Sequence, residues 1–290
     1  MRHPKLKSNR RRAYAQVREN YSAPSLLNDV RHVINASAKD PSELHTENSA
    51  SFGQFHLNGI NATRLLANLS SVTSSMRVLD VGCGIGGAGR TLVEEFGASV
   101  VGIDMSFEYA HSASLLNGAA GLSTKFHVCV GDALSLPVGS GKFDLVWAQH
   151  VGMNVRDKSD MFREFARVLR ANGTLSIYEI YSGRLPLTHY PVPWARDATS
   201  SFLISQKDIR GLIADQGFVE VSWYDMTDQA LDGLRAVRPV LKQPSSRELG
   251  LHLLVDDFGC RIQNLRTNLE EGRLSVASGI FTAIGRTLGC

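Results

Sequence analysis

The sequence predicts an α/β fold with a mainly parallel sheet, and two regularities support this prediction. Short apolar runs recur along the chain from residue 77 onward, and most are followed by a stretch with helical periodicity. Strands that alternate with helices at this spacing form parallel sheets with right-handed crossovers. We predict strands at 77–81, 99–103, 126–130, 143–148, 173–178, 219–224 and 275–283. The helices of this part are predicted at 86–96, 107–119, 158–169 and 206–216.

We divide the chain into a flexible basic tail at 1–14, a helical accessory region at 15–72 and a sheet domain at 73–290. Helical periodicity in the accessory region covers 15–21, 24–34 and 57–69. Two insertions interrupt the sheet domain. The first, 181–202, is rich in proline and long for a connection between a strand and a helix. The second, 226–273, contains helical stretches at 231–240 and 249–269, and we expect both insertions to cover the ligand-binding edge.

Composition limits the class of protein. With 290 residues, 43% hydrophobic and 20% charged, the chain can bury a large core. Its apolar runs are too short to span a membrane, and no apolar stretch follows the basic N-terminal residues as it would in a secretory signal. The four cysteines have no C-x-x-C spacing, which is typical of reduced thiols. We therefore expect a cytoplasmic protein.

The net charge of +3 is concentrated in the first twenty residues, which carry six arginines and lysines between residues 2 and 12. Such a cluster is either a nucleic-acid-binding tail or a solvated, flexible start of the chain. Aromatic residues do not interleave with it, as they would on a surface that stacks bases. We favour the solvated tail and expect no nucleic-acid partner.

The most informative segment is the glycine-rich turn after the first predicted strand, with Gly82, Gly84 and Gly86. Glycine lets the backbone approach a ligand, and the helix that follows offers free amide donors. Gly82, Gly84 and Gly87 also satisfy the dinucleotide fingerprint G-x-G-x-x-G, so the turn alone leaves two ligand classes open. Asp80 favours a ligand with a cationic group, because its carboxylate would repel a pyrophosphate.

Three more strands end in polar residues at the same edge of the sheet, where open α/β sheets bind ligands. Asp104 ends the second strand and is positioned to accept both hydroxyls of a ribose. Asp132, in the turn after the third strand, is positioned to accept a hydrogen bond from the amino group of an adenine. Gln149 and His150 follow the fourth strand.

In these four motifs the chain resembles the class I S-adenosylmethionine-dependent methyltransferases, over roughly residues 15–285. It is most similar to the sarcosine/dimethylglycine methyltransferase group, through 52–56, 61–64, 149–154 and 190–195. It also resembles tocopherol-type and quinone-type C-methyltransferases, through 80–87 and 163–169. The resemblance implies a Rossmann-like class I methyltransferase fold. In that fold a mainly parallel seven-stranded sheet has helices on both faces, the last strand runs antiparallel between its neighbours, and a helical lid and an inserted cap are added.

The resemblance also implies the ligands and their contacts. The cofactor is S-adenosyl-L-methionine, and the residues expected to bind it are Gln54, Arg64, Asp80, Gly82, Gly84, Gly86, Asp104, Met105, Gly131, Asp132, Ala133 and Gln149. The residues expected to contact the acceptor at the reacting centre are Tyr21, His56, His150 and Asn154. A methylated amine is held well by aromatic faces, which adds Tyr178, Tyr190 and Trp194. The alternatives are a capping role for His56, contact with the adenine for His150, and simple packing of Tyr21 and Tyr178.

Methyl transfer requires in-line placement of a nucleophile in a dry site, and a base only where the acceptor must lose a proton. We expect a small-molecule acceptor, first an amine, with hydroxyl, sulfur or carbon acceptors as alternatives. Two other classes remain open, an NAD(P)-dependent oxidoreductase and a non-catalytic cofactor-binding domain. The nine histidines are scattered, so no metal site is expected. A dimer is compatible with the sequence.

Overall fold

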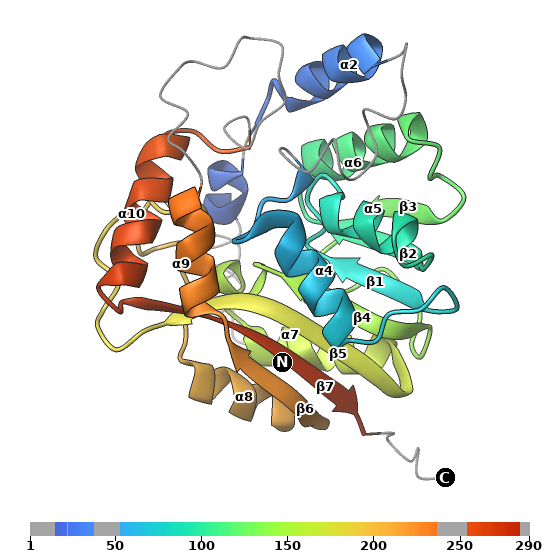
Figure 1. Ribbon diagram of the computed structural model, residues 1–290. Helices are drawn as coiled ribbons and strands as arrows, with labels where there is room; N and C mark the ends of the chain where they lie inside the picture. The colour runs from blue at the N-terminus through green and yellow to red at the C-terminus, as the bar shows by residue number, and fades with distance from the viewer. Residues whose placement is uncertain (1–14, 22, 38–52, 237–253, 285–290) are drawn as a thin grey trace.

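The computed structural model describes residues 15–21, 23–37, 53–236 and 254–284. These residues form a seven-stranded sheet with helices on both faces (Figure 1). The strand order is β3-β2-β1-β4-β5-β7-β6. The strands are β1 (Arg77–Val81), β2 (Ser99–Asp104), β3 (Phe126–Val130), β4 (Phe143–Gln149), β5 (Leu169–Ser182), β6 (Phe218–Asp225) and β7 (Leu274–Ala283). The predicted α/β fold is confirmed.

Strands β1 to β5 pair in parallel, whereas β7 runs antiparallel between β5 and β6. This is the arrangement that the family resemblance implied. The central strands β1 and β4 are buried along almost their whole length, as parallel strands covered on both faces must be. Their carboxyl ends, and that of β2, therefore meet at one edge of the sheet.

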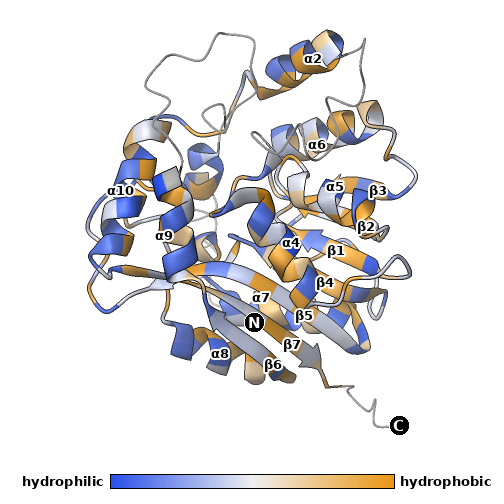
Figure 2. Cartoon of the chain, viewed as in Figure 1, coloured by the Kyte–Doolittle hydropathy of each residue, from blue (hydrophilic) through white to orange (hydrophobic). Residues whose placement is uncertain are grey.

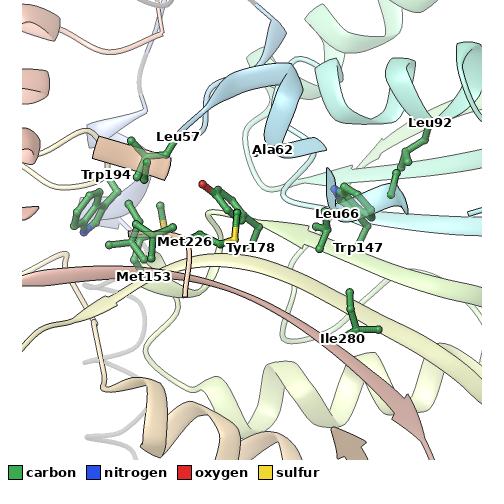
Figure 3. Packing of buried hydrophobic residues seen from close by; sticks show 14 of the residues in the cluster. Leu57, Ala62, Leu66, Leu92, Trp147, Met153, Tyr178, Trp194, Met226 and Ile280 are labelled. Carbon is green, nitrogen blue, oxygen red and sulfur yellow. The ribbon is translucent and has the colours of Figure 1, made fainter. Parts of the chain in front are cut away.

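Two helical layers cover the sheet. On one face, α4 (Gly59–Leu69), α5 (Gly87–Glu94) and α6 (Phe107–Ala119) lie over β1 to β3 and part of β5. On the other face lie α7 (Lys158–Val168) and α8 (Gln206–Ala214). Because side chains alternate along a strand, Val78 and Leu79 belong to different hydrophobic clusters on the two faces. Figure 3 shows the first cluster, where Leu66 of α4 and Leu92 of α5 lie near Trp147 of β4.

The accessory elements lie outside these layers. Residues 15–20 are helical, and α2 (Leu26–Ala36) packs against α6. The second insertion contains α9 (Thr227–Ala236) and α10 (Phe258–Glu270), which pack against each other. Figure 2 shows many hydrophilic residues on both of these helices, as expected for an outer layer. The predicted tail at 1–14 lies outside the described residues.

Three elements differ clearly in their bounds from the sequence prediction. The helix predicted at 231–240 is α9, which begins earlier, at Thr227, and residues 237–240 and 249–253 of the two predicted helices lie outside the described residues. The stretch 249–269 was expected to be one helix, but residues 254–257 form turns, and α10 begins only at Phe258, after Asp257 with a φ of 49°. A left-handed residue cannot continue a right-handed helix, so the apolar periodicity was misleading there. Strand β5 is longer than the predicted 173–178, because its ends are fixed by pairing with β4 and β7. No helix among the described residues is long and apolar enough to cross a membrane.

Candidate functional site

The glycine-rich turn between β1 and α5 has the conformation that the sequence predicted. Gly82, Gly84 and Gly86 have φ values of 70°, 55° and 85°, which residues with a Cβ rarely adopt. The amide of Gly82 donates to the carbonyl of Ile103 at 2.7 Å, so the turn is fixed to β2. Gly87 has a different role. A Cβ there would lie 1.8 Å from the carbonyl oxygen of Gly53, so Gly87 permits close packing of the chain onto the helix start.

Two acids lie at this edge, Asp80 fully buried and Asp104 partly buried. Asp80 is 2% exposed, and its Oδ2 has no hydrogen-bond partner among the described residues. Burial, with a smaller contribution from the charge of Asp104, raises the pKa of Asp80 to about 7. The oxygens of Asp104 accept the amides of Gly84 and Ser106, each at 2.9 Å. A carboxylate has further lone pairs, so these bonds leave Asp104 able to accept ligand hydroxyls.

The third turn follows β3 and is attached to the same edge. The amide of Gly131 donates to the carbonyl of Asp104 at 2.9 Å, and a Cβ at Gly131 would lie 2.8 Å from Ile103. Asp132 accepts the amide of Leu134 at 2.8 Å, which shapes its own turn. The predicted contacts of Asp132 and Ala133 with an adenine, and of Met105 with the cofactor, remain predictions.

A buried hydrogen-bond network connects the accessory region to β4 and α5. The hydroxyl of Thr63 lies 2.9 Å from Oε1 of Gln54 and 3.2 Å from Oε1 of Gln149. Gln54 also donates a hydrogen bond to the hydroxyl of Thr91, and Gln149 accepts one from the indole N–H of Trp147, both at 2.9 Å. The Nε2 of Gln149 is buried and lacks a partner in the described part of the chain. Gln54 and Gln149 are thus held rigidly beside the glycine turn.

Arg64 is separated from this network. It forms an ion pair with Glu95 at 2.8 Å, and both side chains are about a third exposed. Glu95 follows the C-terminal end of α5, whereas the glycine turn lies at its N-terminal end. The structure therefore does not bring Arg64 together with the other residues predicted to bind the cofactor. Its neighbour Thr63 contacts them instead, although the sequence analysis did not select it.

Three rings meet beside the network. The ring of His150 stacks on Tyr178 with centroids 5.4 Å apart, and His56 meets both rings edge-on at 6.1 and 6.5 Å. Burial lowers the pKa of His56 to about 4 and that of His150 well below its ordinary value. Both imidazoles are therefore neutral at pH 7.

The polar atoms of these rings differ in their partners. The Nε2 of His56 lies 2.9 Å from the carbonyl of Gly59, to which it donates, and 3.0 Å from Thr63. His56 thus also fixes the start of α4. The Nε2 of His150 and the hydroxyl of Tyr178 are buried without a partner among the residues described. Figure 3 shows the Tyr178 hydroxyl on the side of Leu57.

A second group of predicted residues is joined by hydrogen bonds. The hydroxyl of Tyr21 donates to Asn154 at 2.9 Å, and Asn154 donates to the carbonyl of Trp194 at the same distance. Burial, together with the charge of Asp104, raises the pKa of Tyr21, so its hydroxyl stays protonated. Trp194 is 1% exposed, and Tyr190 packs partly buried against the same cluster. Their predicted contacts with the acceptor remain predictions.

One functional candidate was missed entirely by sequence reasoning. Arg261 of α10 is completely buried, and its guanidinium donates to Asn20, to the carbonyl of Val192 and to Asp256. It therefore joins the N-terminal helical segment, the first insertion and the second insertion. No sequence signal identifies this role, because the partners are far apart along the chain. Among the described residues no group of three or more histidine, cysteine, aspartate or glutamate side chains lies together as a metal site would require.

Comparison with known proteins identifies the domain. Residues 79–177 match a family model described as a methyltransferase domain. This part of the chain is therefore a match to a methyltransferase domain. The match runs from β1 through most of β5 and includes the glycine turn, Asp104 and the end of β4.

Individual relatives agree with this assignment. A chloroplastic tocopherol O-methyltransferase of Arabidopsis thaliana is 43% identical over 101 residues, which are 35% of this chain and 29% of the relative. Phosphoethanolamine N-methyltransferase 1 of the same plant is 28% identical over 213 residues, 71% of this chain and 41% of the relative. The chain therefore spans less than half the length of either relative.

A solved structure extends the comparison beyond the matched region. A putative sarcosine dimethylglycine methyltransferase from Galdieria sulphuraria superposes with a TM-score of 0.65 at 20% identity. The superposition covers 86% of this chain and 98% of that one. At this identity the likeness shows the fold, which here includes regions outside the methyltransferase domain model.

Proposed function

We propose that this protein transfers a methyl group from S-adenosyl-L-methionine to a small-molecule acceptor by in-line displacement. The observation that carries the proposal is Asp80, an acid buried beside the glycine turn with an oxygen that lacks a partner. A cationic ligand group at this position would satisfy that oxygen and stabilise its charge. Asp104, one strand away, supplies acceptors for ribose hydroxyls, so the two acids together fit a charged nucleoside.

The same geometry argues against a dinucleotide cofactor. The third glycine of the fingerprint, Gly87, packs against Gly53 in this chain. A pyrophosphate at the turn would meet two acids, Asp80 and Asp104. No arginine or lysine among the described residues contacts either acid in the hydrogen bonds and ion pairs of the structure. An NAD(P)-dependent oxidoreductase is therefore the weaker alternative.

The acceptor site is assigned to the rings of His56, His150 and Tyr178 with the Tyr21–Asn154 pair. A neutral His150 with an open Nε2 accepts a hydrogen bond from an amine or a hydroxyl and so orients its lone pair. The hydroxyl of Tyr178 offers a donor in the same region. We propose an amine nitrogen as the acceptor atom, with a hydroxyl as the alternative. We also propose a cytoplasmic location, supported by the free thiols Cys83, Cys129 and Cys260.

Calorimetric titration tests the cofactor. We expect S-adenosyl-L-methionine and S-adenosylhomocysteine to bind in the micromolar range and NAD far more weakly. Binding of NAD as tight as that of S-adenosyl-L-methionine would overturn the proposal.

The acceptor is identified by incubating the enzyme with a cell extract and an isotopically labelled methyl donor, followed by untargeted mass spectrometry. The control is the Asp80→Asn variant, which we expect to lose labelling because its cofactor site is impaired. A labelled small molecule found only with the wild-type enzyme supports methyl transfer. Binding of the cofactor without any labelled product would favour a non-catalytic cofactor-binding domain.

A further inference from the structure

Two buried ionisable groups have no part in the site described so far. Glu179 of β5 is 5% exposed, and Lys158 at the start of α7 is 6% exposed. Because side chains alternate along β5, Glu179 lies on the face of the sheet opposite Tyr178, where α7 and α8 pack. Burial of a charge is costly unless hydrogen bonds compensate it. The hydrogen bonds of these two groups must therefore offset the cost of their burial.

Both groups bind the backbone of the same short segment, residues 151–155. The Oε1 of Glu179 accepts the amides of Val151 and Gly152, at 2.9 and 2.8 Å. The ammonium of Lys158 donates to the carbonyl of Val155 at 2.7 Å and to the carbonyl of Phe202. The carboxylate thus binds N–H groups where the segment begins, and the ammonium binds a carbonyl where it ends. Each charge is next to backbone groups of the opposite partial charge.

This segment carries the groups that face the proposed reaction. His150 directly precedes it and has a φ of 54°, an unfavourable conformation that surrounding contacts must maintain. Asn154 lies within it and binds Tyr21. Val151 contacts the glycine turn so closely that a Cβ on Gly82 would lie 2.5 Å from its Cγ2. A shift of the segment would therefore move His150, Asn154 and the Val151 side chain that packs against the glycine turn.

We propose that Glu179 and Lys158 are positioning residues that hold segment 151–155 from behind the sheet and so place His150 and Asn154 in the acceptor site. They touch neither the proposed cofactor contacts nor the acceptor rings. The assignment rests on the proposed function only in its consequence for methyl transfer. The positioning itself is a property of the protein without ligand.

The test uses the full chain and compares Glu179→Gln, Glu179→Met and Lys158→Met with the control Glu220→Gln. Glu220 forms an exposed ion pair with Arg210 on the edge strand β6. Methionine keeps much of the volume of either side chain but cannot bind the backbone, whereas the amide oxygen of glutamine can accept the same two N–H groups. A role in positioning therefore predicts that glutamine rescues what methionine removes.

The first measurement is made without ligand. In Glu179→Met we expect hydrogen exchange of the Val151 and Gly152 amides to accelerate by about tenfold or more relative to amides of β1, and the His150 ring resonances to shift in NMR spectra. Lys158→Met should shift the same resonances. Glu179→Gln and Glu220→Gln should match the wild type. The proposal fails if Glu179→Met leaves these signals unchanged, or if exchange accelerates equally throughout the sheet, which would indicate general destabilisation.

The second measurement is turnover with the acceptor identified in extract and with S-adenosylhomocysteine as the binding probe. We expect Glu179→Met and Lys158→Met to lower kcat by about tenfold or more, while Glu179→Gln stays within about threefold of the wild type. A loss in Glu179→Gln as large as that in Glu179→Met would overturn the proposal. If the wild type neither binds the probe nor transfers methyl groups, the proposed function fails, and the exchange measurement still decides the role of Glu179.

Discussion

Asp80 is an acid that the fold buries beside a second acid, and no arginine or lysine in the described part of the chain forms an ion pair with it. Its pKa of about 7, against an ordinary value of 3.8, means that near neutral pH the ligand-free site holds this carboxyl partly protonated. A cation binds well only to the ionised form. Cofactor binding and the ionisation of Asp80 should therefore be linked.

This linkage predicts that affinity for S-adenosyl-L-methionine rises as the pH increases from 6 to 8, because Asp80 ionises over this range. The Asp80→Asn variant should bind about tenfold or more weakly at pH 8 and should show a flatter pH dependence. Calorimetry at several pH values measures both effects. Parallel pH dependences for the two proteins would show that Asp80 does not contact the cation.

Asp104 should make a separate contribution through the ribose. Asp104→Ala is expected to weaken cofactor binding by about 1.5–3 kcal/mol, since it removes charge-assisted hydrogen bonds. It also removes the acceptor of the Gly84 amide, so Asp104→Asn, which keeps one oxygen, is the matched control and should lose less. Wild-type affinity in both variants would place the ribose elsewhere.

The sequence was sufficient to place these acids, because a charged residue that ends an apolar strand has few alternative positions. It was not sufficient for the network of His56, Thr63 and Gln149. Those side chains come from different elements and meet only after the fold has formed. Arg64 illustrates the limit, since its ion pair with Glu95 lies apart from the buried hydrogen bonds that the preceding residue, Thr63, forms with Gln54 and Gln149.

Among the elements, those with glycine turns or strong periodicity were predicted closely, and so were the helices of the region 15–72, whereas the helices of the second insertion were not. The glycines at 82, 84 and 86 specify positive φ locally, so the start of α5 could be predicted within one residue. The start of α10 could not, because Asp257 has a left-handed conformation that its residue type only permits. The ends of β5 depend on partner strands that local sequence does not reveal.

The accessory segments are joined by polar contacts as well as by apolar packing, and Arg261 bonds to three of them. Arg261→Met should leave the side-chain oxygen of Asn20 and the carbonyl of Val192 without their buried donor, while preserving apolar volume. We expect faster hydrogen exchange at 15–20 and 189–195, with the sheet unchanged. Arg210→Met, which breaks an exposed ion pair on β6, is the control and should leave these segments unaffected. Equal exchange in Arg261→Met and wild type would contradict this role.

At the scale of the whole molecule, buried ionisable groups make stability depend on pH in opposite directions. The pKa of His56 is about 4 in the folded protein, against an ordinary value of 6.5. As the pH falls from 6.5 to 4, the unfolded chain therefore binds a proton that the folded protein does not, and the free energy of unfolding decreases. Asp80 and Glu179 have raised pKa values, both about 7, and they lower stability as the pH rises from about 4 to 7.

Replacement of His56 should remove its part of this pH dependence and leave that of Asp80 and Glu179. His56→Gln keeps a donor for the Gly59 carbonyl but cannot be protonated in this range. Its thermal unfolding temperature should therefore fall less than that of the wild type as the pH decreases from 6.5 to 4. His127→Gln, a strand histidine whose side chain is largely exposed, is the control and should follow the wild type. A parallel decrease in all three proteins would mean that His56 is not kept neutral by the fold.

The position of β7 also determines the order in which the sheet can form. During synthesis β6 emerges before β7, yet β6 pairs with no other strand of the described sheet. Until residues 274–283 are available, one side of β5 is unpaired and β6 has no strand to pair with. Open edges of this kind pair readily with other chains. A chain truncated before Leu274 would therefore tend to aggregate. In the full chain, the edge of β5 stays unpaired until β7 has left the ribosome.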